Sequence, residues 1–290
     1  MMKKVLITGK DSYIGNSLEN WLMKKPDTYK IDTVDMKGDF WRKKDFSQYD
    51  VIFHVAGIAH ISSEPKMEDL YYRVNRDLVI DTAKKAKREG VKQFIFMSSI
   101  IVYGDGSNCK RVIDRNTVPV PSNFYGNSKL QAEEGIKSLE DESFKIVVIR
   151  PPMIYGKNSK GNYPRLAKLA RKIPIFPDID NERSMLHIDN LCEFIKIMID
   201  NEESGIFFPQ NKEYVRTSEM VRIIAEVHGK KIKLFKGMNW AVKMAFRIRV
   251  VNKIFGNLVY DQSMSSYDKE NYRIRDLTES IELTEKDNGE

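Results

Sequence analysis

The sequence is poor in cysteine and has no long apolar run. Cys109 and Cys192 are its only cysteines, which gives no disulfide framework and is typical of the reducing cytoplasm. Residues 94–97 and 146–149 form the best apolar stretches and end at polar residues or proline, far short of the roughly 20 residues that cross a bilayer. The first nine residues lack a signal-peptide layout. We therefore expect a cytoplasmic protein.

Metal-binding and hydrolase patterns are also missing. Cysteine and histidine do not occur at the spacing of zinc ligands, so we predict no metal site. Ser98 and Ser99 lack the flanking glycines of a hydrolase nucleophile elbow. We interpret the histidines as structural rather than catalytic; they are His54, His60, His187 and His228.

Much of the net charge of +7 is concentrated in one segment, since Val227 to Tyr260 contains no acidic residue. The pattern admits two interpretations, a solvated basic helix face near a polyanionic small substrate, or a contact with a membrane surface or a partner. The sequence favours the first, and peripheral membrane contact through residues 230–253 is the less favoured alternative. A nucleic-acid partner is not expected. The basic residues are Lys230, Lys231, Lys233, Lys236, Lys243, Arg247, Arg249 and Lys253.

Short runs rich in Val, Ile and Phe alternate with longer stretches of helical periodicity up to Arg150. This alternation predicts an α/β fold, a Rossmann-like doubly wound parallel sheet. Beyond Arg150, prolines punctuate shorter segments that precede helices near 190–198 and 218–227. We predict one domain over 1–155, on which a helix near 187–201 packs back, and a smaller, mostly helical lobe over 156–290. The expected strands are 5–8, 31–35, 51–55, 93–98 and 145–150, and the expected helices include 18–23, 70–86 and 130–139.

The first predicted strand leads into a glycine-containing turn that is typical of a dinucleotide site. Gly9 permits the tight turn, and Gly15 permits close packing of the following helix, whose N-terminus would hold a pyrophosphate. Ser12 stands where the usual pattern has a middle glycine. Asp35 ends the second strand, where a carboxylate binds the adenine-ribose 2′-hydroxyl and disfavours a 2′-phosphate. We therefore predict that the 1–155 domain binds NAD(H) rather than NADP(H).

Tyr125 and Lys129 are four residues apart at the start of a predicted helix. This spacing places both side chains on one helix face, where they can act together in proton transfer. A free phenol has a pKa of about 10, so a base near neutrality needs a shift of roughly three units. An ammonium at about 4 Å has an effect of that size at an effective dielectric of about 20.

Taken in order, these patterns resemble the extended short-chain dehydrogenase/reductase family of sugar-nucleotide epimerases, dehydratases and ketoreductases. The resemblance also rests on the His54–Gly57 loop, Asn75, the serine motif Ser98–Gly104 and the segment Arg150–Gly156. It implies that Tyr125 is the acid/base, that Lys129 lowers its pKa and holds the nicotinamide ribose, and that Ser99 binds the reacting sugar oxygen. The implied cofactor-binding residues are Gly9, Ser12, Tyr13, Ile14, Gly15, Asp35, Asp45, Phe46, Val55, Ala56, Gly57, Asn75, Ser98, Tyr125, Lys129 and Pro152.

The second half of the chain resembles members that act on UDP-N-acetylhexosamines and their 4-keto-6-deoxy derivatives. The likeness rests on 160–163 and 183–191. It implies substrate binding by Ser99, Val102, Asn162 and Arg183, the last two at the diphosphate, which a guanidinium binds with two parallel hydrogen bonds. Met153 replaces the family's substrate-side asparagine. The resemblance further implies a homodimer and a role in surface polysaccharide biosynthesis.

Several functions remain open at this point. The sequence does not separate a UDP-sugar 4-epimerase from a 4-ketoreductase, while a 4,6-dehydratase is disfavoured because Ile100 and Ile101 stand where its acidic pair follows the serine motif. A redox-sensing or RNA-associated dinucleotide-binding module without turnover is the alternative of another class. Such a module has no need of Ser99, Tyr125 and Lys129 together, so the sequence favours an enzyme.

Overall fold

The computed structural model describes residues 2–59, 65–105, 111–244 and 249–286. The chain forms two compact units. Unit 1 comprises Met1–Gly104, Val118–Pro151 and Leu191–Pro209, and unit 2 comprises Asp105–Thr117, Pro152–Asn190 and Gln210–Glu290. Where we expected one boundary near residue 155, the chain passes several times from one unit to the other.

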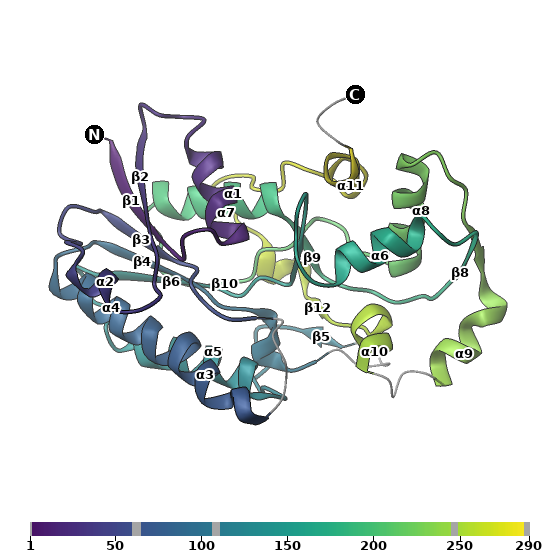
Figure 1. The fold of residues 1–290 in the computed structure, drawn as a ribbon, viewed down its shortest axis with the longest axis horizontal. Coiled ribbons are helices and arrows are strands. Elements are labelled where there is room, and N and C mark those ends of the chain that lie inside the picture. Colours follow the sequence, from purple (N-terminus) through teal and green to yellow (C-terminus); the bar gives the residue numbers. More distant parts are fainter. Residues whose placement is uncertain (1, 60–64, 106–110, 245–248, 287–290) are drawn as a thin grey trace. The chain divides into compact units, whose positions relative to one another are not determined.

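A six-stranded parallel sheet forms the centre of unit 1 (Figure 1), in the order β10-β6-β4-β3-β1-β2. This confirms the predicted Rossmann-like fold. Five strands lie where the sequence predicted them, and the sixth, β10, was not predicted because three residues with a half-exposed Ile206 carry little pattern. The strands are β1 (Lys3–Thr8), β2 (Tyr29–Val34), β3 (Val51–His54), β4 (Gln93–Met97), β6 (Lys145–Ile149) and β10 (Gly205–Phe207).

Helices cover both faces of this sheet. In Figure 1, α1 and α7 lie on one face, and α3, α4 and α5 lie on the other. Burial on both faces explains why the inner strands β1, β3, β4 and β6 contain nearly continuous apolar runs. A π-helical segment, η2 (Arg73–Asp77), separates α3 from α4. The helices are α1 (Tyr13–Leu22), α2 (Phe40–Lys43), η1 (Pro65–Met67), α3 (Glu68–Tyr72), α4 (Leu78–Arg88), η3 (Ile100–Tyr103), α5 (Phe124–Lys137) and α7 (Ile188–Asp200).

The part of α7 that belongs to unit 1 is tied to the sheet by side chains. Gln93 Nε2 donates to Met198 O at 2.8 Å, and Lys3 Nζ donates to Ile199 O at 2.7 Å. Trp21 Nε1 of α1 donates to Glu193 Oε2 at 2.8 Å. These bonds hold α7 beside α1 on the same face of the sheet.

Unit 2 combines helices with three short parallel strand pairs, β7 with β9, β8 with β11 and β5 with β12. Its core is formed largely by the buried faces of α6 and α8. Among the described residues, no helix is both long enough and apolar enough to span a membrane. The elements are β5 (Val112–Ile113), β7 (Met153–Tyr155), α6 (Asn162–Ala170), β8 (Ile175–Pro177), β9 (Met185–His187), α8 (Thr217–Val227), β11 (Lys233–Phe235), η4 (Lys236–Met238), α9 (Asn239–Met244), α10 (Arg249–Phe255), β12 (Val259–Tyr260), η6 (Gln262–Ser265) and α11 (Leu277–Glu285).

Candidate active site

The turns after β1 and β3 meet at the carboxyl edge of the sheet. Gly9 has a φ of +87°, a conformation that residues with a side chain rarely adopt. A Cβ on Gly9 would also lie only 3.0 Å from the backbone nitrogen of Ala56, so there is no space for a larger residue. Strand β1 has β2 on one side and β3 on the other. The strand order therefore reverses at β1, and ligands of doubly wound sheets bind at such a switch point.

Helix α1 begins at this same turn. Ser12 is its N-cap, and the Ser12 Oγ accepts a hydrogen bond from Gly15 N at 3.1 Å. A Cβ on Gly15 would lie 3.3 Å from Ile7 and 3.4 Å from Val55, so glycine is what lets the helix approach the strand. The first turn, which begins with Tyr13 and Ile14, contains no acidic side chain. The helix dipole and first-turn amides thus suit an anion such as a pyrophosphate.

Asn75 fixes the loop that follows β3. It is fully buried in the π-helical segment, its Oδ1 accepts from Ile58 N at 2.9 Å, and its Nδ2 donates to Ile58 O at 3.0 Å. A Cβ on the exposed Gly57 would lie 3.0 Å from Asn75 Oδ1 and 3.3 Å from Lys129 Nζ. The loop that contains Val55, Ala56 and Gly57 is therefore held directly beside Lys129.

Other expected cofactor ligands differ in how available their side chains are. Asp35 is exposed directly after β2, and its Oδ1 accepts from Lys37 N at 2.9 Å. Asp45 is also exposed, and hydrogen bonds from Ser47 lower its pKa. The Phe46 side chain is fully buried in the core of unit 1, so only its backbone could reach a ligand.

Close packing of α5 against η3 brings Tyr125 to Ser99. A Cβ on Gly126 would lie 2.6 Å from Ile101 O, which is too close for any other residue without a backbone shift. Asn123 caps α5, its Oδ1 accepting from Gly126 N at 3.0 Å. A side-chain hydrogen bond joins Ser99 to Tyr125. The structure thus brings together two of the three expected catalytic residues.

The pKa of Tyr125 is raised to about 12, which corrects the expected lowering. Burial is the largest cause, because it penalises the phenolate, and the neighbouring phenol of Tyr71 adds to it. The rings of Tyr71 and Tyr125 meet edge to face, with centroids 5.7 Å apart. The hydrogen bond with Ser99 acts in the other direction and lowers the pKa. Tyr125 is consequently a protonated phenol near neutral pH.

Lys129 lies one helical turn along the same face of α5 and is 6% exposed. Its Nζ donates to Met97 O at 2.9 Å and lies 4.8 Å from the centroid of the Phe96 ring. Burial lowers its pKa to about 8, and Glu133 opposes that shift. Lys129 is therefore a cation held at the end of β4.

Sequence reasoning missed a buried ionic network behind these residues. Glu133 and Arg150 are 5% and 6% exposed, and Arg150 Nη2 donates to Glu133 Oε2 at 2.5 Å. Ser98 Oγ donates to Glu133 Oε1, and Arg150 Nη1 donates to Tyr103 Oη at 2.7 Å. The spacing of Glu133, four residues after Lys129, was the available signal. Tyr71 gave no such signal, since it is remote in sequence from Tyr125.

The expected substrate ligands fall in both units, and each stays a prediction. In unit 1, Val102 is fully buried in η3. In unit 2, Asn162 is the first residue of α6, and Arg183 Nη1 donates to Gly256 O at 2.9 Å. Arg183 Nε is buried without a partner among the described residues, and burial lowers the pKa of this arginine to about 10. Pro152, an expected cofactor contact, also belongs to unit 2.

The histidines make no catalytic contact in the described residues. His54, the last residue of β3, is fully buried; its Nδ1 lies 3.1 Å from Thr8 Oγ1, and burial lowers its pKa to about 3. His187 is buried as well, and its pKa is lowered to about 4. Both rings are therefore neutral near pH 7. His60 and Cys109 lie outside the described residues.

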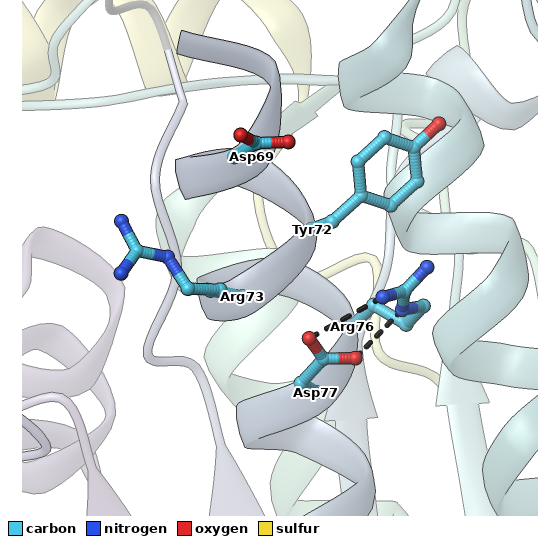
Figure 2. Close-up of a pocket in the computed structure, with 5 residues that line it drawn as sticks. All are labelled: Asp69, Tyr72, Arg73, Arg76 and Asp77. Atoms are coloured by element: carbon cyan, nitrogen blue, oxygen red, sulfur yellow. Dashed lines mark hydrogen bonds and ion pairs between the residues drawn. The ribbon is translucent and has the colours of Figure 1, made fainter.

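A surface hollow of about 610 Å³ is lined by residues of α3 and η2. Figure 2 shows its lining and the ion pair between Arg76 and Asp77, whose Nε and Oδ1 are 2.7 Å apart. Tyr72 Oη accepts from Asn127, which is two residues from Tyr125 and hence on another side of α5. This hollow is therefore distinct from the Ser99–Tyr125–Lys129 cluster. Its lining is Asp69, Tyr72, Arg73, Arg76 and Asp77.

The residues at the carboxyl edge of the sheet fit a dinucleotide. The turn at Gly9 and the acid-free start of α1 suit a diphosphate. The exposed carboxylate of Asp35 suits a ribose diol. Tyr125 lies in the first turn of α5, and the Nζ of Lys129 lies at the end of β4. The arrangement can bind a dinucleotide at one end and hold or move one proton at the other.

Comparisons with known proteins agree with this geometry. A UDP-glucose 4-epimerase of Vibrio cholerae is 29% identical over 292 residues, 91% of this chain and 88% of the relative. An Escherichia coli N-acetyl-alpha-D-glucosaminyl-diphospho-ditrans,octacis-undecaprenol 4-epimerase is 31% identical over 170 residues, 56% of this chain and 50% of the relative. The crystal structure of UDP-glucuronic acid 4-epimerase from Bacillus cereus in complex with NAD shares the fold, with a TM-score of 0.73 at 18% identity over 97% of this chain and 96% of that one.

Residues 5–208 match the model of the NAD dependent epimerase/dehydratase family, which is well over half of the chain. The match includes the glycine turn, the serine motif and the Tyr125–Lys129 pair. NAD, the cofactor expected from Asp35, is thereby confirmed as the family's cofactor. The chain belongs to the NAD dependent epimerase/dehydratase family and is an NAD-dependent enzyme.

Proposed function

We propose that the protein oxidises or reduces C4 of a UDP-linked sugar, with Tyr125 as the proton shuttle. The observation that carries this proposal is the hydrogen bond between Ser99 and Tyr125. Lys129 lies one turn after Tyr125 on α5. General acid/base catalysis needs a titratable group within reach of the reacting hydroxyl, and Ser99 marks where that hydroxyl would be held. The epimerases named among the relatives support a sugar substrate.

The pKa values bear on the direction of proton transfer. With a pKa of about 12, Tyr125 holds its proton near neutral pH and is ready to donate it to a C4 alkoxide, as reduction of a ketosugar requires. Oxidation requires Tyr125 to take the proton of the 4-hydroxyl instead. The Ser99 hydrogen bond favours that step because it lowers the pKa of the phenol.

Bound NAD would supply a hydride acceptor at its nicotinamide and, in the oxidised form, a positive charge. Lys129 would position the nicotinamide ribose, and the turn at Gly9 with the start of α1 would hold the pyrophosphate. Asp35 would bind the adenine ribose, which favours NAD(H) over NADP(H).

The identity of the sugar is a more specific part of the proposal. We favour a UDP-N-acetylhexosamine or its 4-keto-6-deoxy derivative, destined for surface polysaccharide, because of the motifs at 160–163 and 183–191. Asn162 and Arg183 would bind the diphosphate. The unpartnered Nε of Arg183 leaves a charge-assisted donor for a phosphate oxygen. A homodimeric assembly is likewise part of the proposal.

A panel of UDP-sugars tests the proposal and separates its two forms. The purified protein is incubated with UDP-glucose, UDP-N-acetylglucosamine or a UDP-4-keto-6-deoxy-N-acetylhexosamine, with and without NADH, and products are identified by mass and NMR. A C4 epimer formed without added reductant identifies an epimerase. Stoichiometric loss of NADH with the keto substrate identifies a reductase. Tight NAD binding without turnover of any member of the panel would favour the redox-sensing alternative.

A further inference from the structure

In the described part of unit 2, four of the exposed large apolar side chains lie on β8, β11 and α9. Phe235, Trp240 and Met244 are 49%, 67% and 74% exposed, and Ile175 is 46% exposed. A single exposed apolar residue needs no explanation, but a group of large ones marks a contact surface. None of the four belongs to the core of unit 2.

The β8–β11 strand pair gathers two of these residues on one face. Ile175 is the register partner of Lys233, and Phe235 lies two residues further along the same strand. Alternate residues of a strand point to the same side, so all three side chains share one face. The Phe235 ring then leans over the next turn, since a Cβ on Gly237 would lie 2.4 Å from Phe235 Cζ.

Helix α9 continues this surface. Asn239 Nδ2 donates to Asp178 O at 2.8 Å, which places the first residue of α9 beside the end of β8. Trp240 and Met244 are four residues apart and so lie on the same face of α9. Figure 1 shows α9 and β8 as neighbouring segments of unit 2.

Exposed basic side chains surround the apolar ones. Lys230 and Lys231 precede β11, Lys236 follows it, and Lys230 Nζ donates to the carbonyl of Arg171 just after α6. We call this the basic-apolar surface. Its exposed members are Arg171, Lys172, Ile175, Lys230, Lys231, Lys233, Phe235, Lys236, Trp240 and Met244.

Asp178 and Asp180, which follow β8 next to the basic-apolar surface, share one arginine. Asp178 Oδ1 lies 3.0 Å from Arg216 Nη2, and Asp180 Oδ1 lies 3.4 Å from Arg216 Nε. The sequence from Val227 to Tyr260 contains no acid at all. The surface therefore has an excess of positive charge and complements an anionic partner.

We propose that the basic-apolar surface binds the headgroup region of an anionic phospholipid membrane. Trp240, Phe235 and Met244 would enter the boundary between headgroups and acyl chains, and the lysines would contact lipid phosphates. A merely solvated basic face does not explain exposed tryptophan and phenylalanine. An RNA strand would stack on the aromatic rings but would leave the aliphatic Ile175 and Met244 without a matching group. This inference goes beyond the proposed function and does not depend on it.

Vesicle flotation tests the inference with the full chain. Vesicles of phosphatidylcholine alone are compared with vesicles that also contain phosphatidylglycerol, at low and high salt. We expect the bound fraction to rise at least about 10-fold with phosphatidylglycerol and to fall with salt. Phe235→Ser/Trp240→Ser should reduce binding about 10-fold, and so should Lys231→Glu/Lys233→Glu/Lys236→Glu.

Matched controls come from unit 1. Phe40 is 84% exposed, so Phe40→Ser removes an even more exposed aromatic ring elsewhere. Lys24→Glu/Lys25→Glu/Lys30→Glu makes the same charge change at exposed positions. Both controls should float like the unmodified chain, and circular dichroism should show that every variant is folded. Absence of flotation with phosphatidylglycerol would overturn the inference, as would equal losses in the control variants, or lysine-dependent retention on an RNA matrix without flotation.

Discussion

The buried pair of Glu133 and Arg150 permits a prediction whose size follows from the structure. The Glu133 carboxylate accepts from Arg150 at 2.5 Å and from Ser98, and the two side chains are only 5% and 7% exposed. Glu133→Gln removes one charge and leaves the guanidinium buried without a counter-ion. Loss of one partner of such a pair costs about 3–5 kcal/mol. We expect the free energy of unfolding of unit 1 to fall by that amount.

Urea unfolding followed by tryptophan fluorescence measures this change. Trp240→Phe serves as the background for all variants, because the two remaining tryptophans, Trp21 and Trp41, belong to unit 1. Glu134→Gln is the matched control, since Glu134 is the exposed neighbour of Glu133 on α5. It should change the free energy of unfolding by no more than about 0.5 kcal/mol.

A double-mutant cycle then isolates the ion pair. Glu133→Gln/Arg150→Met removes both charges, so the two losses should be less than additive by at least about 1 kcal/mol. The reasoning would be refuted if Glu133→Gln were as stable as Glu134→Gln, or if the two single losses simply added. Either result would mean that the two charges do not stabilise each other in the folded chain.

Four further predictions concern single residues. Gly126→Ala should lower kcat about 10-fold or more, because its Cβ would meet Ile101 O at 2.6 Å and displace Tyr125; an unchanged kcat in steady-state assays would contradict this. The lowered pKa of Lys129, about 8, predicts that stability rises by up to about 3 kcal/mol between pH 8 and 10.5, since the unfolded chain binds the extra proton in that window. Urea titrations should show this rise in the unmodified chain and its absence in Lys129→Met. Asp35→Ala should shift the ratio of NADP(H) to NAD(H) affinity by about 10-fold towards NADP(H), measured by fluorescence titration. Arg183→Ala should mainly raise the KM for the UDP-sugar, and a fall in kcat alone would remove Arg183 from substrate binding.

The sheet of unit 1 was predictable from sequence because β1, β3, β4 and β6 each contain a compact apolar run between polar segments, and β2 alternates apolar and polar residues. The glycine turn and the Tyr125–Lys129 pair are local patterns as well, so their positions on β1 and α5 followed directly. Strand β10 was not predicted, because it is a strand through its pairing with β6 and not through its own composition.

The electrostatics of the site were not predictable in the same way. Spacing alone suggested that Lys129 lowers the pKa of Tyr125, whereas burial and the Tyr71 ring raise it. Both effects depend on tertiary contacts, as does the bond from Lys129 Nζ to Met97 O. The buried state of Phe46, expected at the cofactor, is a tertiary property of the same kind.

The exchange of strand and helix segments between the units also lay beyond sequence reasoning. Residues 105–117 group with unit 2, where β5 pairs with β12. A strand of two or three residues whose partner is far along the chain leaves no periodic signal. The three short strand pairs of unit 2 were missed for this reason.

Replacing Tyr125 by phenylalanine tests the central claim most directly, because it removes one oxygen and keeps the ring that packs on Tyr71. Turnover of the best UDP-sugar should fall at least about 100-fold, while NAD affinity by titration stays within about 3-fold. Tyr72→Phe is the matched control, since its hydroxyl bonds Asn127 on another side of α5 and should not affect turnover. Turnover by Tyr125→Phe equal to that of Tyr72→Phe would contradict the assignment of Tyr125 as the proton shuttle.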